Sequence, residues 1–528
     1  PERTEGRRNT VLDQMVKSGR LDTDSAIAYK EQKLSLDYHA LDHKQGTGTY
    51  LRERLRRMLT AKRPVRSKYA EWQAQQFHDD SVAWANDPLY GWCNKNTKPD
   101  GSHYDLYQDG LIIHTTIDSR MQTIAEQAMQ AHLRDSLQPA FDREARTNKR
   151  WPFASSMSET DVKRSLYRSM RQSERYAVMR HAGASESEIE KAFHTPTEMT
   201  LYAPTKDAPD REVDTTMTPM DSLLYYKRFL RSGFVCIEAE TGHVKAYVGG
   251  RNFTHFQYDM AGMGRRQVGS TIKPFLYSLA MENGMTPCDE VPNVQTTYTL
   301  PSGQTWTPRN GSRDRYGENV TLRWGLQQSN NWISAYLINM WRPGNFAKLL
   351  REYGIESLSI HPSLSLCLGT ADISVLEMCA AYTAFVNQGT HYTPLFVTHI
   401  TNRDGEVLAT FAPDTHEVIS AEASYKMLDL LRAVMDGGTG SRMRFRYGVR
   451  APMGGKTGTT NDNSDGWFMC VTPQLVAACW VGGEERDIHL GSMAFGQGAS
   501  AALPISAKFF QQIFANPRLP YDPYAQFN

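Results

Sequence analysis

The sequence predicts an α+β protein in which one antiparallel sheet is covered by helices. Two hairpin patterns support this, because residues 234–250 and 466–481 each hold two β-rich apolar runs joined by a short polar turn. Between these hairpins lie apolar segments that are long enough to form buried helices. Strands at both ends of a region, with helices between them, indicate a sheet packed against a helical layer.

The buried helices are expected where apolar residues recur every three or four positions. The first follows Ser270 and is apolar along almost its whole length after Pro274. Proline is tolerated only in the first turn of a helix, so this helix must begin near Ser270. Further helices of this region are predicted at residues 321–328, 373–386, 425–435 and 502–514.

The N-terminal residues 1–60 are also expected to form helices. Their first segment has apolar residues at positions 11, 12, 15 and 16, which is a helical spacing. The basic stretch at 50–66 is interpreted as a solvated helix face. Contact with an anionic membrane or polymer is the alternative.

The segment before residue 230 contains one predicted strand and a long polar region. A β-rich run at 111–118 precedes an amphipathic helix at 121–129. Residues 131–225 are polar, charged and helical in character, with a looser stretch at 195–220. We interpret them as a linker or accessory domain without a candidate site.

The composition excludes several classes of function. The 528 residues carry 59 Lys+Arg against 58 Asp+Glu, so nothing indicates a nucleic-acid partner. The seven cysteines are dispersed without a CxxC pair, so we expect no zinc site. No run of 18 apolar residues is present, so no transmembrane helix is expected. Because the chain begins at Pro1, we interpret it as a piece of a longer protein.

Ser270 and Lys273 form the candidate catalytic pair. Their spacing places both side chains on one face of a helix. Burial lowers the pKa of a lysine, and a neutral amine can accept the proton of the serine hydroxyl. The serine would thereby become an activated nucleophile. No other Ser-x-x-Lys occurs in the sequence.

Two companion motifs follow in order, Ser329-x-Asn331 and Lys456-Thr457-Gly458. The ordered triplet is typical of penicillin-binding proteins and class A β-lactamases. Flanking segments extend the similarity at residues 265–274, 306–310, 317–322 and 454–468. Over residues 230–515 the sequence therefore resembles penicillin-binding transpeptidase domains, although that family often has proline where Val268 stands. The resemblance implies the fold shared by these domains and serine β-lactamases.

Earlier segments resemble class A, bifunctional penicillin-binding proteins. Residues 115–126 are similar to their linker, and residues 7–12 to the tail that follows their glycosyltransferase domain. That domain is absent from this chain, so we expect no glycan polymerisation by it. The predicted divisions are a helical tail at 1–60, a linker region at 61–229 with an insertion at 131–225, a transpeptidase domain at 230–515 and a C-terminal tail at 516–528.

The resemblance implies a serine acyl-enzyme mechanism. Ser270 would attack the carbonyl between the two terminal D-alanines of a peptidoglycan stem peptide, with Lys273 as the base. Ser329 and Asn331 would relay a proton to the leaving amine and hold Lys273. Lys456 would supply positive charge that keeps Lys273 neutral and attracts the substrate carboxylate. An amine from a neighbouring stem peptide would then complete the cross-link, and β-lactams would acylate Ser270.

Further substrate contacts are implied in the same way. The hydroxyls of Thr457 and Thr459 would bind the substrate carboxylate, and the backbone N–H groups of Ser270 and Thr459 would form an oxyanion hole. The other residues assigned to substrate binding are Gly458, Asn330 and Trp306. Neither a metal nor an organic cofactor is implied.

The resemblance also predicts where such a protein acts and with what. Its partners would be peptidoglycan stem peptides, glycan strands, β-lactam inhibitors and inner-membrane proteins of cell-wall synthesis. Its place would be the extracytoplasmic (periplasmic) face of the cytoplasmic membrane, anchored by an N-terminal segment that this chain lacks.

Two alternatives remain open at this stage. One is a D,D-carboxypeptidase or β-lactamase, in which water replaces the amine; a class A β-lactamase needs a positioned glutamate, and no Glu-x-x-Leu-Asn segment is present. The other is a β-lactam sensor or scaffold that is acylated without turnover. Turnover measurements distinguish them.

Overall fold

The computed structural model describes residues 2–32, 46–300 and 302–527. The chain forms two compact units, residues 1–43 and 44–528. The smaller unit holds helices α1 (Glu2–Lys17) and α2 (Thr23–Glu31), and α2 is capped by the Asp22 carboxylate, which accepts the Ser25 N–H at 2.8 Å. No helix within the described ranges is both long and apolar enough to cross a bilayer.

The larger unit is built on a five-stranded antiparallel sheet with the order β16-β17-β18-β4-β5. The strands are β16 (Gly454–Thr459), β17 (Asp465–Val471), β18 (Leu475–Gly482), β4 (Arg231–Glu238) and β5 (Val244–Val248). The two predicted hairpins supply β4–β5 and β17–β18, and the two hairpins are joined where β18 pairs with β4. The predicted α+β class is therefore confirmed.

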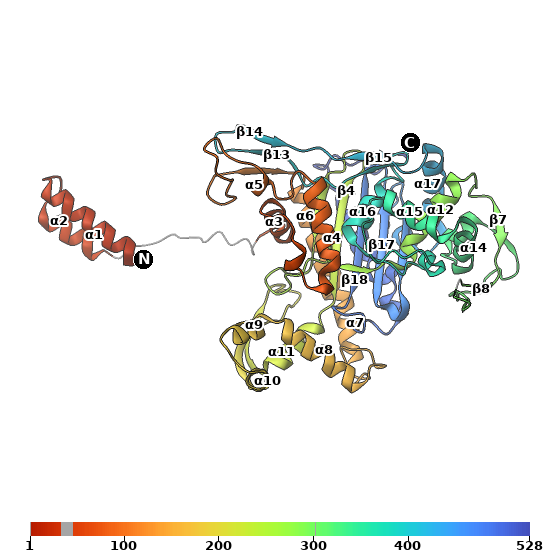
Figure 1. Cartoon of the computed structure of the whole chain (residues 1–528), viewed down its shortest axis with the longest axis horizontal. Helices are drawn as coiled ribbons and strands as arrows, with labels where there is room; N and C mark the ends of the chain where they lie inside the picture. Colours follow the sequence, from red (N-terminus) through yellow and green to blue (C-terminus); the bar gives the residue numbers. More distant parts are fainter. Residues whose placement is uncertain (1, 33–45, 301, 528) are drawn as a thin grey trace. The chain divides into compact units, whose positions relative to one another are not determined.

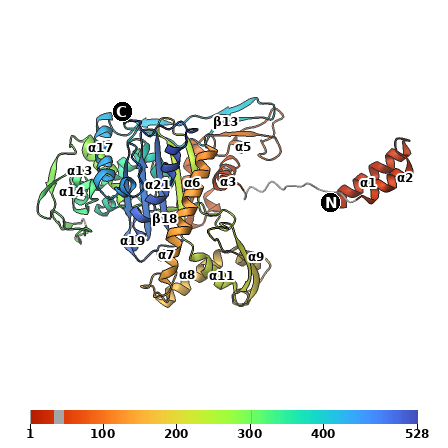
Figure 2. The ribbon, with the colours of Figure 1, turned by 180° about the vertical axis from the view of Figure 1, so that it is seen from behind.

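Successive residues of a strand point to opposite faces of the sheet, and both faces are buried here. Phe234 and Cys236 join a core with α6 (Ser119–His132) and α21 (Leu503–Ala515). Val235 and Ile237 join a second core with α16 (Val375–Thr383) and the helices beyond it. Figure 1 shows α16 on one side of the sheet, and Figure 2 shows α6 and α21 on the other.

The helical layer on the α16 side positions the candidate site. Helix α12 (Lys273–Glu282) packs against α14 (Asn331–Trp341), α15 (Pro343–Glu352) and α17 (Ala421–Gly437). Helix α17 also lies against strand β16, so the first helix and the edge strand share a neighbour. The short α13 (Leu322–Gln327) precedes α14.

Helix α3 (Thr49–Leu59) differs from the predicted division at residue 60. Its apolar side chains Tyr50, Leu51 and Leu55 are buried in the core that includes β5. It therefore belongs to the larger unit and not to an N-terminal tail. Basic residues lie between the buried ones in this helix, so its composition did not indicate that it packs in the core.

The strand expected at 111–118 is β1 (Ile112–Thr115), which pairs with β13 (Val397–Thr401); β13 also pairs with β14 (Val407–Thr410). Asp118 caps α6 by accepting the N–H groups of Arg120 and Met121. The other α-helices before the five-stranded sheet are α4 (Ala74–Asn86), α5 (Trp92–Lys95), α7 (Gln138–Glu144), α8 (Glu159–Gln172), α9 (Glu174–His181), α10 (Glu186–Phe193) and α11 (Pro219–Lys227).

The stretch at 195–220, expected to be loose, is mostly a hairpin. Strands β2 (Thr197–Tyr202) and β3 (Glu212–Met217) pair in continuous antiparallel register. Most of their side chains are exposed or half-exposed, so the sequence lacks the apolar alternation that marks a half-buried strand. The hairpin is followed by α11, whose Met220 joins a small core with residues of α8 and α10.

Candidate active site

Ser270 lies on a 3₁₀ turn, η4 (Gly269–Ile272), that connects strand β6 (Arg265–Gln267) to helix α12. The predicted helix thus begins one turn later than Ser270, and Pro274 occupies its first turn as expected. A 3₁₀ turn has three residues per turn, so Ser270 and Lys273 still lie on one face. The Ser270 hydroxyl is half-buried and makes no hydrogen bond to any described residue.

The Lys273 amine is fully buried and faces the Ser329–Asn331 segment. Its Nζ lies 2.7 Å from Asn331 Oδ1, 2.6 Å from Ser329 O and 3.4 Å from Ser329 Oγ. Among the described residues its partners are a carbonyl, a hydroxyl and an amide oxygen, and none of them is a carboxylate. Burial lowers the pKa of Lys273 to about 7, so a large fraction of the amine is neutral near neutral pH.

Ser329 occupies the tight connection between α13 and α14. Its backbone φ is +54°, a left-handed conformation that is uncommon for residues other than glycine. This conformation lets Ser329 O accept from Lys273 while Ser329 Oγ lies 2.8 Å from Lys456 Nζ. One hydroxyl therefore lies between two lysine amines.

Lys456 is buried on β16, an edge strand of the sheet. Its Nζ also donates to Thr457 O at 3.0 Å. Burial, together with repulsion from Lys273, lowers the pKa of Lys456 well below its usual value. Two ammonium groups sharing one hydroxyl repel each other, so a proton on one amine favours the neutral form of the other.

The two threonines of β16 differ in their surroundings. The Thr457 hydroxyl donates to Thr439 Oγ1 at 2.6 Å, and the Thr459 hydroxyl accepts the Gly498 N–H at 3.0 Å. Thr439 lies in the Gly-Thr-Gly connection after α17 and was not selected from the sequence. A glycine-flanked threonine gives no chemical signal by itself, because only the fold brings it beside Thr457.

The backbone N–H of Thr459 faces the open edge of the sheet. Thr460 N–H donates to Asp465 O on β17, and alternate residues of an antiparallel strand point their N–H groups in opposite directions. The open edge faces the nucleophile segment, since a Cβ placed on Gly269 would lie 3.4 Å from Thr459 N. The N–H of Ser270 likewise donates to no described residue. The two N–H groups thus border the same space.

Asn330 does not fit its predicted role in substrate binding. Its side chain is 1% exposed, and its Oδ1 accepts the N–H groups of Trp332 and Ile333 as the cap of α14. Its Nδ2 donates to Asn293 Oδ1 at 2.8 Å. Because all of its polar groups are engaged inside the protein, Asn330 supports the site's architecture rather than contacting a ligand.

The segment that contains Trp306 continues into residues that contact Asn331. Asn331 Nδ2 donates to Arg309 O at 2.8 Å, and Asn310 Oδ1 accepts the Asn331 N–H at 3.0 Å. Trp306 itself is half-buried on β9 (Thr305–Trp306) and packs near Tyr298. Its contact with substrate stays a prediction. Gly458 lets β16 approach η4, because a Cβ there would lie 2.7 Å from Val268 O.

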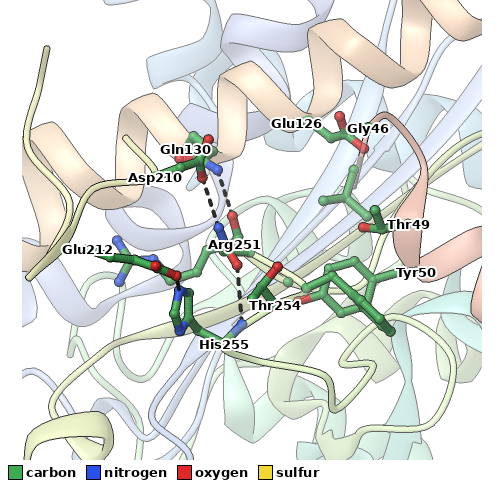
Figure 3. A pocket seen from close by; sticks show the side chains of 14 residues that line it. Gly46, Thr49, Tyr50, Glu126, Gln130, Asp210, Glu212, Arg251, Thr254 and His255 are labelled. Atoms are coloured by element: carbon green, nitrogen blue, oxygen red, sulfur yellow. Dashed lines mark hydrogen bonds and ion pairs between the residues drawn. The ribbon is translucent and has the colours of Figure 1, made fainter. Parts of the chain in front are cut away.

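A separate cavity of about 450 Å³ contains none of these candidate residues (Figure 3). Some of its polar side chains have partners within the cavity lining. His255 Nε2 lies 2.8 Å from Glu212 Oε1, and Gln130 Nε2 donates to Arg251 O at 2.6 Å. We assign it no function. No group of three or more His, Cys, Asp or Glu side chains suited to a metal ion occurs within the described ranges.

Comparison with known proteins adds independent findings. Residues 232–481 match the penicillin-binding protein transpeptidase domain, and residues 148–230 match the penicillin-binding protein middle domain. The second match covers much of the region that the sequence analysis left without a role. Penicillin-binding protein 1A of Aquifex aeolicus is 36% identical over 277 residues, which are 52% of this chain and 37% of that protein. The aligned region therefore spans little more than a third of this relative.

Solved structures share the fold. Penicillin-binding protein 1A from Haemophilus influenzae superposes with a TM-score of 0.64 at 20% identity, covering 99% of this chain and 78% of that one. The PonA1 protein from Mycobacterium tuberculosis, solved in complex with penicillin V, has a TM-score of 0.50 at 19% identity and covers 80% and 90% of the two chains. At these identities the likeness shows the architecture alone.

Proposed function

We propose that this chain, which belongs to the penicillin-binding protein family through its transpeptidase domain at residues 232–481, is a serine D,D-transpeptidase. Its substrates are stem peptides of peptidoglycan, which it cross-links. The observation that carries this proposal is the meeting of three distant motifs around one hydroxyl. Ser329 Oγ lies 3.4 Å from Lys273 Nζ and 2.8 Å from Lys456 Nζ, and Lys273 is one turn from Ser270.

Acylation follows from these positions. Ser270 Oγ forms a bond to the carbonyl carbon between two D-alanines while its proton passes to neutral Lys273. The oxyanion that develops accepts hydrogen bonds from the N–H groups of Ser270 and Thr459. The carbon–nitrogen bond then breaks, and the leaving amine of D-alanine takes a proton through Ser329 Oγ. An acyl-enzyme on Ser270 remains.

The second step reverses the roles of these groups. An amine from a neighbouring stem peptide forms a bond to the acyl carbon and gives a proton to Lys273 through Ser329 Oγ. The bond between the acyl carbon and Ser270 Oγ then breaks, and Ser270 Oγ takes the proton from Lys273. The new amide bond is the cross-link. Asn331 holds Lys273 throughout, because its Oδ1 accepts from the amine at 2.7 Å.

Recognition of the terminal carboxylate falls to the edge strand. Burial and repulsion from Lys273 lower the pKa of Lys456 and so disfavour its charged form. A bound carboxylate raises the pKa of a neighbouring amine, so substrate binding draws a proton onto Lys456 and keeps Lys273 neutral. The Thr459 hydroxyl accepts one hydrogen bond and retains its proton for the carboxylate. Thr457 and its neighbour Thr439 supply further hydroxyl groups.

The substrate sets the place and partners of this activity. Stem peptides and glycan strands occur in the cell envelope, so we place the domain on the extracytoplasmic face of the cytoplasmic membrane. Other proteins of cell-wall synthesis are its expected partners, and β-lactams its covalent inhibitors. No cofactor takes part.

Intact mass after mixing with penicillin G tests the proposal. A persistent adduct that maps to Ser270 is expected, and Ser270→Ala should remove it without changing the thermal unfolding midpoint by more than a few degrees. An adduct that persists in the variant would refute the assignment of the nucleophile. Rapid release of hydrolysed drug would instead indicate a β-lactamase. Acylation without cross-linking of a stem-peptide donor and acceptor would indicate a sensor or scaffold.

A further inference from the structure

We propose that Arg266 and Asp465 are positioning residues that hold the two N–H groups of the oxyanion hole at a fixed separation. This inference rests on the proposed function and assigns a role to two buried charges outside the motif triplet. They lie 199 positions apart in the sequence and meet only in the folded chain.

The Arg266 guanidinium is held on several sides. Its Nε lies 2.7 Å from Asp465 Oδ1, and its Nη1 donates to Gly483 O at 3.2 Å. The guanidinium carbon lies 4.9 Å from the centre of the Trp480 ring, a cation–π contact. Arg266 sits in the middle of β6, four residues before Ser270. Its side chain therefore anchors the start of the nucleophile segment to the sheet.

The Asp465 carboxylate joins this anchor to strand β16. Its side chain is fully buried; Oδ1 also accepts from Trp480 Nε1 at 3.0 Å, and Oδ2 accepts from the Thr460 hydroxyl at 2.9 Å. Thr460 Oγ1 in turn accepts the Asp465 N–H at 3.0 Å. Thr460 directly follows Thr459. One carboxylate thus links the strand before Ser270 to the residue after Thr459.

This link matters because the two segments approach closely at two glycines, where neither segment has a side chain of its own. A Cβ on Gly269 would lie 3.1 Å from Thr459 O, and a Cβ on Gly458 would lie 2.7 Å from Val268 O. Glycine at both positions allows this close approach, and the Thr271 methyl group also lies against Gly458. The Arg266–Asp465 pair adds a charged link beside this contact. Trp467 Nε1, which donates to Gln267 O at 2.9 Å, assists it.

The test compares acylation kinetics of the chain and its variants with penicillin G, separating the non-covalent dissociation constant K from the acylation rate constant k2. The variants are Arg266→Lys, Asp465→Asn and the double variant R266Q/D465N. The double variant leaves no unpaired buried charge, which makes it the variant most able to fold. Arg265→Gln is the matched control, because Arg265 adjoins Arg266 on β6 but pairs with Glu377 and Asp79, away from β16.

We expect k2 to fall about 10-fold to 100-fold in Asp465→Asn and in the double variant, because misplacing a transition-state donor by an ångström has effects of that size. K should change less than twofold, and Arg266→Lys should lose less k2 than the double variant. Arg265→Gln should keep both constants within twofold.

Other results would overturn the inference. Folded variants with an unchanged k2, or an equal loss of k2 in Arg265→Gln, would show that the pair does not position the site. A rise in K with k2 unchanged would show a binding role instead. If the unaltered chain formed no adduct on Ser270, the proposed function itself would fail, and this outcome is visible before any variant is made.

Discussion

The rate of Ser270 acylation should rise with pH through the pKa of Lys273. Burial lowers that pKa to about 7. The neutral fraction of the amine is then about one tenth at pH 6 and about nine tenths at pH 8. If neutral Lys273 is the base, the second-order rate constant for acylation by penicillin G should increase about tenfold over this range and level off above it.

Adduct formation followed by intact mass, at pH values from 5.5 to 9 and constant ionic strength, measures this profile. Lys273→Ala should slow acylation by about 10²–10⁴-fold, the usual contribution of a general base. A rate constant that is flat or falls between pH 6 and pH 8 would refute the assignment of Lys273. So would unchanged acylation in the variant.

The pH dependence of the free energy of unfolding tests the lowered pKa of Lys273 independently of catalysis. The pKa of Lys273 is lower in the folded state than in the unfolded state, where it is near 10.4. Between these values the unfolded chain binds the extra proton, so the contribution of Lys273 to the free energy of unfolding rises with pH from about 7 to about 10. The kinetic profile should be level over the upper part of that range, above about pH 8.

Two further substitutions test the architecture around the site. Asn330→Ala should lower the free energy of unfolding by about 1–3 kcal/mol, because α14 loses its cap and Asn293 loses a partner; chemical denaturation measures this, and a change under 0.5 kcal/mol would contradict it. Gly458→Ala should slow acylation and lower stability by about 1–3 kcal/mol, because the new Cβ would meet Val268 O. Gly344→Ala, at an open helical position, is its control and should be neutral or slightly stabilising.

Secondary structure could be predicted from the sequence where contiguous residues contain all the information that defines the element. The hairpins β4–β5 and β17–β18 were predictable because alternating apolar residues and a short turn are contiguous in the chain. The start of α12 was predictable to within a turn, because Pro274 restricts where a helix can begin. Helix α3 was predicted as a helix, but its place in the larger unit depends on partners far along the chain. The β2–β3 hairpin was missed because its largely exposed strands lack an apolar alternation.

The sequence by itself determined which chemical groups the site can contain: a Ser-x-x-Lys, a Ser-x-Asn and a Lys-Thr-Gly in one order, within an α+β pattern. Only the tertiary structure decided how those groups are used. It buries Lys273 beside Ser329 and so lowers its pKa, withdraws Asn330 into a helix cap, and brings in Thr439. It also joins Arg266 to Asp465. These outcomes depend on burial and on contacts between distant segments, which no local pattern contains.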